Sequence, residues 1–136
     1  EEPMSAQVAA GIIRNADGRI LIAERFDECP YGGRWEFPGG TLEEGETLQE
    51  CLQRELEEEL GIRIRIDEPF VVIERPYASP DISLHTFLCT HIGGDPTAIE
   101  CNAWRWVDSS ELREANLTGA DREVLKALEE LWAEQG

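Results

Sequence analysis

One stretch of the chain, residues 47–60, combines the pattern of an amphipathic helix with a high density of glutamate. At about 100° of rotation per residue, four leucines fall on a single stripe: Leu48, Leu52, Leu56 and Leu60. Thr47 and Glu50 have the spacing of a capping box, and Gly61 suits the left-handed position that ends a helix. The sequence therefore predicts a helix over residues 47–60 that buries one face.

The glutamates of this helix divide by the direction in which they point. Glu50 and Glu57 lie roughly opposite the leucine stripe, where we expect solvent. Glu55 and Glu59 lie at the edge of the stripe, and Glu58 lies one step further round. Three carboxylates therefore converge at the border of the predicted core.

This convergence is unfavourable for a helix without a partner. Glu55 and Glu59 repel each other at i, i+4, and acidic groups near the helix end oppose the macrodipole at about 0.3–1 kcal/mol each. Partial burial of an unpaired carboxylate adds a further cost. A divalent cation such as Mg²⁺ would reverse all three effects, and Arg54 could pair with one carboxylate and orient it. The alternative interpretation is a solvated acidic face.

Length and charge limit the partners of the chain. The 136 residues predict one domain over 1–136, with residues 1–6 either flexible or added ahead of the natural chain. The formal charge of −17 disfavours binding to nucleic-acid polymers and to anionic membranes. No apolar stretch approaches the roughly 18 residues of a membrane helix. A small nucleotide whose charge is masked by a metal remains compatible with this charge.

Cysteine and histidine suggest structural roles. Cys51 and Cys89 lie in apolar segments, no C-x-x-C spacing occurs, and we expect buried thiols in a reducing cytoplasm. His85 and His91 are six residues apart on a predicted strand, and a structural or surface role is favoured over zinc ligation.

The rest of the chain alternates strands with helices. Residues 8–14 and 20–23 flank an Asp-Gly turn and predict a hairpin. Further strands are expected over 35–37, 62–74, 82–92 and 104–107, with a loop at Pro38-Gly39-Gly40, a helix start at 108–111 and a final helix over 120–133. This order predicts an α/β (α+β) layer arrangement, a sheet covered by helices.

Residues 40–62 carry a specific spacing. The order is Gly40, five residues, Glu46, seven residues, Arg54-Glu55-Leu56, one residue, Glu58-Glu59, one residue and Gly61-Ile62. This pattern resembles the Nudix box at every defining position, and the preceding Trp35-Glu36-Phe37-Pro38-Gly39-Gly40 resembles the lead-in of the MutT-like branch. The resemblance covers nearly the whole chain.

The resemblance implies the Nudix fold, a mixed β-sheet between helices. It also implies hydrolysis of a nucleoside diphosphate derivative with Mg²⁺ or Mn²⁺. Its implied metal ligands are Glu55, Glu58 and Glu59, with the carbonyl of Gly39.

Two more residues take roles from the resemblance. Glu100 corresponds to a loop carboxylate that binds metal or serves as the base, although by itself it is an ordinary loop acid. Arg25 matches an arginine that binds phosphate, and its alternative is a surface charge at a strand end. Which of Glu55, Glu59 and Glu100 would accept the proton of the attacking water stays open.

The nucleobase is the least determined part of the site. Phe37, Tyr77 and Asp121 are the candidate substrate contacts. Asp121 would accept hydrogen bonds from a guanine or a cytosine, or would instead cap the last helix. Tyr77 would stack on the base or would be a loop aromatic.

We therefore predict a MutT-like nucleoside triphosphate pyrophosphohydrolase, acting on substrates such as 8-oxo-dGTP or CTP. The alternatives are hydrolysis of ADP-ribose or a dinucleoside polyphosphate, and a non-catalytic nucleotide-binding module. The chain is expected to be a monomer or a homodimer.

Overall fold

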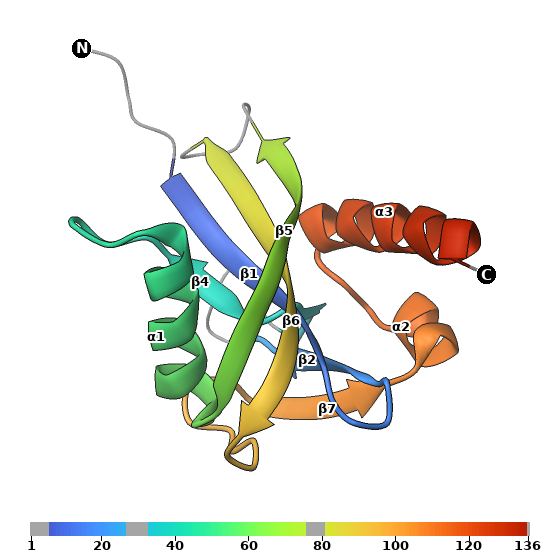
Figure 1. Ribbon diagram of the computed structural model, residues 1–136, viewed down its shortest axis with the longest axis horizontal. Helices are drawn as coiled ribbons and strands as arrows, with labels where there is room; N and C mark the ends of the chain where they lie inside the picture. The colour runs from blue at the N-terminus through green and yellow to red at the C-terminus, as the bar shows by residue number, and fades with distance from the viewer. Residues whose placement is uncertain (1–5, 27–32, 76–80, 136) are drawn as a thin grey trace.

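The computed structural model describes residues 6–26, 33–75 and 81–135 (Figure 1). In these ranges the strands are β1 (Ala6–Arg14), β2 (Ile20–Glu24), β3 (Trp35–Glu36), β4 (Gly39–Thr41), β5 (Arg63–Arg75), β6 (Ile82–Gly93) and β7 (Ala103–Val107). The helices are α1 (Leu48–Leu60), α2 (Ser109–Glu114) and α3 (Gly119–Gln135). Among the described residues, no helix is long and apolar enough to cross a membrane.

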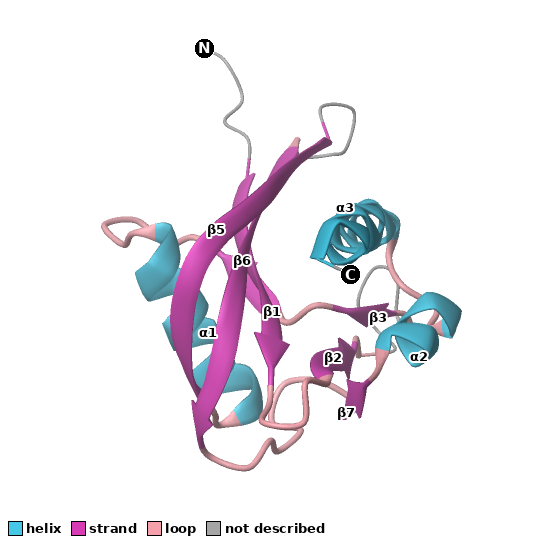
Figure 2. Ribbon diagram, turned by 45° about the vertical axis from the view of Figure 1, so that its right-hand side comes forward, coloured by secondary structure: helices cyan, strands magenta, loops and turns pink. Residues whose placement is uncertain are grey.

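The strands form one mixed sheet in the order β3-β2-β1-β6-β5, with β4 paired to β1 and β7 paired to β2 (Figure 2). β1 and β2 form the predicted antiparallel hairpin, in which Arg14 faces Ile20. β1 and β6 run parallel from Ala6 and Ile82 to Arg14 and Thr90. The helix α1 lies in the long connection between β4 and β5, on one side of this sheet.

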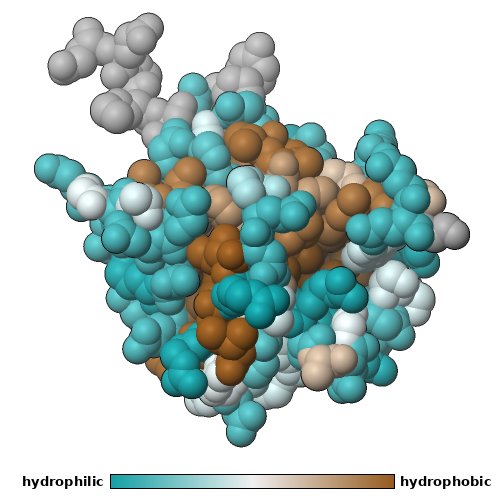
Figure 3. Space-filling view, in the orientation of Figure 1, coloured by the Kyte–Doolittle hydropathy of each residue, from teal (hydrophilic) through white to brown (hydrophobic). Residues whose placement is uncertain are grey.

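The sheet separates two hydrophobic clusters. Alternate residues of β1 point to opposite faces, so Ala9 and Ile13 pack toward α1 while Ala10 and Ile12 pack toward α3. Phe70 and Ile73 of β5 add half-buried surface to the α3 side, where Figure 3 shows apolar surface between β5 and α3. The predicted arrangement, a mixed sheet between helices, is confirmed.

The helix α1 forms for the reasons that its sequence indicated. The hydroxyl of Thr47 accepts the Glu50 N–H at 3.1 Å, and the Glu50 carboxylate accepts the Thr47 N–H at 2.9 Å. Gly61 ends the helix with φ at 68°. The leucine stripe is buried from Leu52 onward, whereas Glu50 and Glu57 are exposed as expected.

Two elements differ from the prediction: strand β4 was not predicted, and the last helix begins one residue earlier than predicted. Pro38-Gly39-Gly40 was expected to end a strand, but Gly39–Thr41 form strand β4, in which they pair with Ala10, Ala9 and Val8 of β1. The last helix begins at Gly119 rather than Ala120, and Thr118 precedes it. The carbonyl of Thr118 accepts the Arg122 N–H at 3.0 Å, which places Asp121 inside the first turn.

Candidate active site

Glu55, Glu58 and Glu59 form what we call the carboxylate face of α1. The three side chains differ strongly in exposure. The side chain of Glu55 is 16% exposed and that of Glu58 is 50% exposed, while Glu59 is buried at 8%. They lie along one edge of α1, between its buried leucine face and solvent. These three residues therefore share one edge of α1, as the helical periodicity predicts.

Two glycines of β4 allow the sheet to approach α1 closely. A Cβ atom on Gly40 would lie 2.1 Å from Oε2 of Glu55, and a Cβ atom on Gly39 would lie 1.9 Å from the carbonyl oxygen of Ala9. Any larger residue at 40 would displace the Glu55 carboxylate, whereas any larger residue at 39 would displace backbone. The Pro-Gly-Gly segment thus sets the distance between β4 and the carboxylate face.

Arg54 connects the carboxylates to the loop that leads into α1. Its Nε and Nη2 atoms donate to the two oxygens of Glu46 at 2.9 and 2.7 Å, a bidentate pair. Its Nη1 atom donates to Glu55 at 2.8 Å and to Glu58 at 3.2 Å. Hydrogen bonds from Arg54 hold the pKa of Glu46 at about 2. Arg54 was expected to pair with one carboxylate, and it forms ion pairs with four: Glu43, Glu46, Glu55 and Glu58.

Glu59 has a strongly perturbed carboxyl group. Burial raises its pKa from 4.5 to about 10, and a hydrogen bond with Glu55 adds to this rise. The negative charges of Glu36, Glu55 and Glu100 act in the same direction. Without a cation, burial and the neighbouring negative charges therefore favour the neutral form of this carboxyl.

The loop that carries Glu100 is attached to the end of α1. The N–H groups of Ile99 and Glu100 both donate to the carbonyl oxygen of Glu59, at 3.0 and 3.1 Å. The side chain of Glu100 is exposed, and its charge contributes to the pKa rise of Glu59. The structure thus places Glu100 beside the buried member of the carboxylate face.

Arg25 is held by a residue that the sequence reasoning did not select. The Nη1 atom of Arg25 donates to Oε1 of Glu36 at 2.7 Å, and both side chains are mostly buried. Burial raises the pKa of Glu36, and the charge of Arg25 opposes this rise. A carboxylate between two aromatic residues in a short predicted strand was the available signal for Glu36.

Asp121 lies in the first turn of α3 and not at its N-cap, so of the two roles left open for it the capping role is wrong. Thr118 occupies the position before the helix, and it interacts with the Asp121 side chain. Oδ2 of Asp121 accepts the N–H of Phe37 at 3.0 Å, and the residue is 4% exposed. Burial raises the pKa of Asp121 to about 7. Phe37 is itself 2% exposed, and Tyr77 lies outside the described residues.

The chemistry of these donors fits a hard divalent cation. All of the candidate ligands offer oxygen, and Mg²⁺ keeps several waters and shares its remaining positions with substrate phosphates. Within the residues that the structure describes, no group of three or more histidine, cysteine, aspartate or glutamate side chains is arranged so that it could hold a metal ion. The buried carboxyl of Glu59 beside Glu55 is the observation that fits a cation best, because a cation would compensate its burial.

The cysteines of the described residues are buried, and both histidines form hydrogen bonds within the protein. Cys51, Cys89 and Cys101 are free and buried, whereas Cys29 lies outside the described residues. Burial raises the pKa of Cys51 to about 11. Nε2 of His85 contacts Oε1 of Gln7 at 2.8 Å, and Nε2 of His91 contacts the carbonyl of Gly94 at 2.6 Å.

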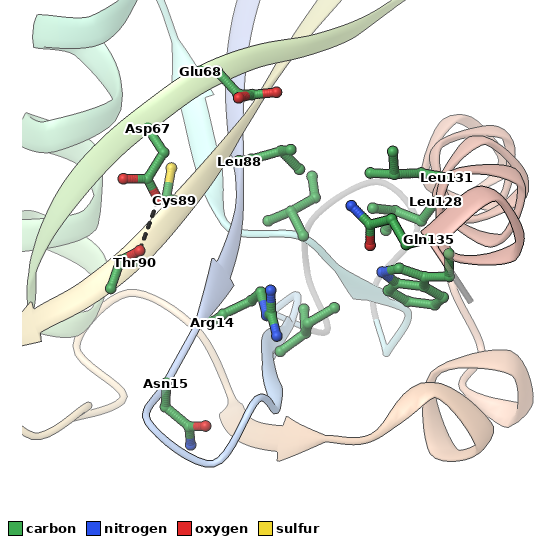
Figure 4. Close-up of a pocket in the computed structure, with 13 residues that line it drawn as sticks. Arg14, Asn15, Asp67, Glu68, Leu88, Cys89, Thr90, Leu128, Leu131 and Gln135 are labelled. Carbon is green, nitrogen blue, oxygen red and sulfur yellow. Dashed lines mark hydrogen bonds between the residues drawn. The ribbon is translucent and has the colours of Figure 1, made fainter.

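A cavity of about 290 Å³ lies elsewhere, between the sheet and the C-terminal half of α3. Arg14 lines it from β1, while Leu128, Leu131 and Gln135 line it from α3 (Figure 4). The residues of the carboxylate face, Arg25 and Asp121 are not among those that line it. The candidate site is therefore an open carboxylate face rather than this cavity.

Known proteins match this chain over most of its length. The NUDIX domain family profile matches residues 4–128. The 8-oxo-dGTP diphosphatase of Haemophilus influenzae is 34% identical over 122 residues, which is 90% of each chain. The CTP pyrophosphohydrolase of Escherichia coli is 36% identical over 121 residues, which is 89% of each chain.

Solved structures match it as well. The solution structure of the Escherichia coli ORF135 protein superposes with a TM-score of 0.84 and 34% sequence identity, over 98% of this chain and 97% of that chain. The family match spans the sheet, α1 with its carboxylates and most of α3. With relatives more than 30% identical over nearly the full length, the chain belongs to the Nudix family, in its MutT-like branch.

Proposed function

We propose that this Nudix protein hydrolyses a nucleoside triphosphate to the monophosphate and pyrophosphate with the help of Mg²⁺ or Mn²⁺. The observation that carries this proposal is the edge of α1, where Glu55 lies against Gly40, shares Arg54 with Glu58 and forms a hydrogen bond with the buried Glu59. Membership of the MutT-like branch makes the chain a hydrolase of diphosphate bonds in nucleotides. The cation would be held by these three glutamates and the carbonyl of Gly39, with Glu100 as a further ligand.

When bound, the cation supplies neutralisation of charge on the phosphoryl oxygens and a lower pKa for an attacking water. The protein supplies orientation and a proton acceptor. Arg54 holds Glu55 and Glu58 in place through hydrogen bonds of 2.8 and 3.2 Å. One carboxylate, that of Glu55, Glu59 or the loop residue Glu100, takes the proton of the water that attacks the phosphorus in line.

Substrate selection depends on the side of the site that contains Arg25 and Asp121. In the proposal, Arg25 contacts the phosphate chain, while Phe37, Asp121 and Tyr77 contact the nucleobase. Two of the similar proteins are an 8-oxo-dGTP diphosphatase and a CTP pyrophosphohydrolase, which supports a guanine or cytosine nucleotide as substrate. The enzyme would thereby clear or regulate the nucleotide pool.

A panel assay tests this function directly. Purified protein with Mg²⁺ is incubated with 8-oxo-dGTP, dCTP, CTP, ADP-ribose and a dinucleoside polyphosphate, and the products are separated. We expect a nucleoside monophosphate and pyrophosphate from at least one triphosphate. The absence of a monophosphate from every substrate would refute the proposal, and cleavage of ADP-ribose alone would favour the alternative class of Nudix substrate.

Two variants on one helix connect the activity to the carboxylate face. Glu58→Gln should lower kcat by at least about 100-fold, because a charged ligand of the cation becomes neutral. Glu57→Gln is the matched control: Glu57 is exposed on the same helix and points away from the face, so kcat should be unchanged. Equal losses in the two variants would show that helix charge in general, and not this face, supports turnover.

The surroundings of the enzyme follow from the same proposal. A small nucleotide is the expected partner, and the free thiols of Cys51, Cys89 and Cys101 suit a reducing cytoplasm. We propose that residues 1–136 act as one domain, as a monomer or a homodimer.

A further inference from the structure

Glu36 lies where three parts of the site meet. It ends β3, opposite Ala23 of β2, and its side chain is 22% exposed. The next residue, Phe37, donates its N–H to Asp121, which belongs to the proposed base-binding side. On the other side, the charge of Glu36 reaches the buried carboxyl of Glu59. Glu36 therefore connects Arg25 with the strand end that meets Asp121.

The same residue holds Arg25 at a fixed position. Oε1 of Glu36 accepts from Nη1 of Arg25 at 2.7 Å. The carbonyl of Arg25 accepts from Nδ2 of Asn102 at 3.1 Å, and Asn102 follows the loop that is bonded to the end of α1. The backbone of Arg25 is thus tied to the Glu100 loop, and its guanidinium is tied to Glu36.

The ion pair between Arg25 and Glu36 is partly shielded from water. The two side chains are 29% and 22% exposed, and such a pair is screened by salt less than a pair on the surface. A neutral residue at position 36 would remove the carboxylate that accepts from Nη1 of Arg25.

We propose that Glu36 is a positioning residue, which holds the Arg25 guanidinium in place for the phosphate chain of the substrate. This inference rests on the proposed function, because it takes a nucleotide phosphate as the partner of Arg25. Glu36 touches neither the phosphate nor the cation in this proposal; it acts through Arg25. Its loss should therefore weaken binding of the substrate more than it slows the chemical step.

A double-mutant cycle tests the role of Glu36. Glu36→Gln, Arg25→Gln and the double variant are assayed with the triphosphate that the panel selects, and kcat and KM are measured separately. We expect Glu36→Gln to raise KM about tenfold with kcat changed less than threefold, and Arg25→Gln to raise KM at least as much. In the Arg25→Gln background, Glu36→Gln should add less than a twofold change in KM.

Glu111→Gln is the matched control, because Glu111 pairs with Arg19 and Arg105 at 3.4 Å outside the site. Its KM should equal that of the wild type. An unchanged KM in Glu36→Gln, or a tenfold effect of Glu36→Gln that persists in the Arg25→Gln background, would overturn the inference. If Glu36→Gln does not fold, Glu36→Asp replaces it, and its shorter carboxylate should give an intermediate rise in KM.

Binding separates this inference from the proposed function. The Kd of α,β-methylene-dCTP in the presence of Mg²⁺ is measured by calorimetry for the wild type, Glu36→Gln, Arg25→Gln and the double variant. If the wild type binds this analogue but cleaves no nucleotide, the proposed function fails and the cycle is judged from Kd. If Kd is the same in Glu36→Gln and the wild type, the role of Glu36 fails independently of turnover.

Discussion

Gly40 matters because a carboxylate occupies the space that its side chain would fill. A Cβ atom at this position would lie 2.1 Å from Oε2 of Glu55, which is the end of a flexible side chain. We expect Gly40→Ala to move the Glu55 carboxylate, costing about 1 kcal/mol of stability but lowering kcat at least about tenfold. Urea unfolding and steady-state kinetics measure the two effects.

Gly39 provides the contrast, since its Cβ atom would lie 1.9 Å from the backbone carbonyl of Ala9. Backbone cannot swing aside, so Gly39→Ala should destabilise the fold by about 3 kcal/mol or more. A Gly40→Ala variant that unfolds as readily as Gly39→Ala would contradict the view that position 40 serves the carboxylate.

Asp121 should make stability depend on pH. Its folded pKa of about 7 exceeds the ordinary 3.8, so the folded protein binds this proton more tightly than the unfolded chain does. The resulting stabilisation is complete below pH 3.8 and is lost as the pH rises through 7. At about 1.4 kcal/mol per pKa unit, the loss is on the order of 4 kcal/mol.

Asp121→Asn removes this titration. The difference in unfolding free energy between the variant and the wild type should therefore change between pH 4 and pH 8 in favour of the variant, as urea titrations at several pH values would show. A constant difference across this range would mean that Asp121 has the same pKa in both states. Because Asp121 sits in the proposed base-binding side, base preference should change in the same pH range.

Within the helix α1, the residues that stabilise its start are different from the residues proposed to bind the cation. The capping box of Thr47 and Glu50 lies at the first turn, while Glu58 and Glu59 lie at the last. Thr47→Ala should cost about 1 kcal/mol in unfolding free energy and leave kcat within twofold of the wild type. Asp108→Ala, which removes the equivalent cap of α2, is the control for losing a cap away from the carboxylate face. A tenfold fall in kcat for Thr47→Ala alone would show that the start of α1 also orders the site.

The elements also differ in how far the sequence predicted them. The helix α1 and the alternating part of β5 follow from local periodicity, and the structure confirms them: Ile62 and Ile64 are buried while Arg63 and Arg65 are exposed. Strand β4 has no such signal, because two of its three residues are glycine. It becomes a strand only because β1 lies beside it.

For the whole molecule, the charge of −17 predicts two separable responses to salt. Any salt screens the repulsion among the acidic groups. Mg²⁺ should stabilise further by binding the folded state, by about 2.7 kcal/mol at 100 times its Kd, or several degrees in Tm for a chain of this size. Thermal unfolding in MgCl₂ and in NaCl at equal ionic strength measures the difference.

Glu58→Gln is the control for that comparison. The variant should show the NaCl response of the wild type and a smaller additional effect of MgCl₂. Equal Tm values for the wild type in the two salts would argue against a specific cation site on the carboxylate face.

The sequence alone determined the helix with its leucine stripe, the gathering of Glu55, Glu58 and Glu59 at the edge of that stripe, and the strands with clear alternation. These features depend on residues within one or two turns of each other, where helix and strand geometry decides direction. Tertiary structure decided the pairs that lie far apart in the chain. Arg25 meets Glu36 only because β2 and β3 are neighbours, and Asp121 meets Phe37, 84 residues away, only because α3 packs over the sheet. The pKa values of Glu36 and Asp121 depend on burial and on the distances to neighbouring charges in the folded chain, and no local sequence pattern encodes these.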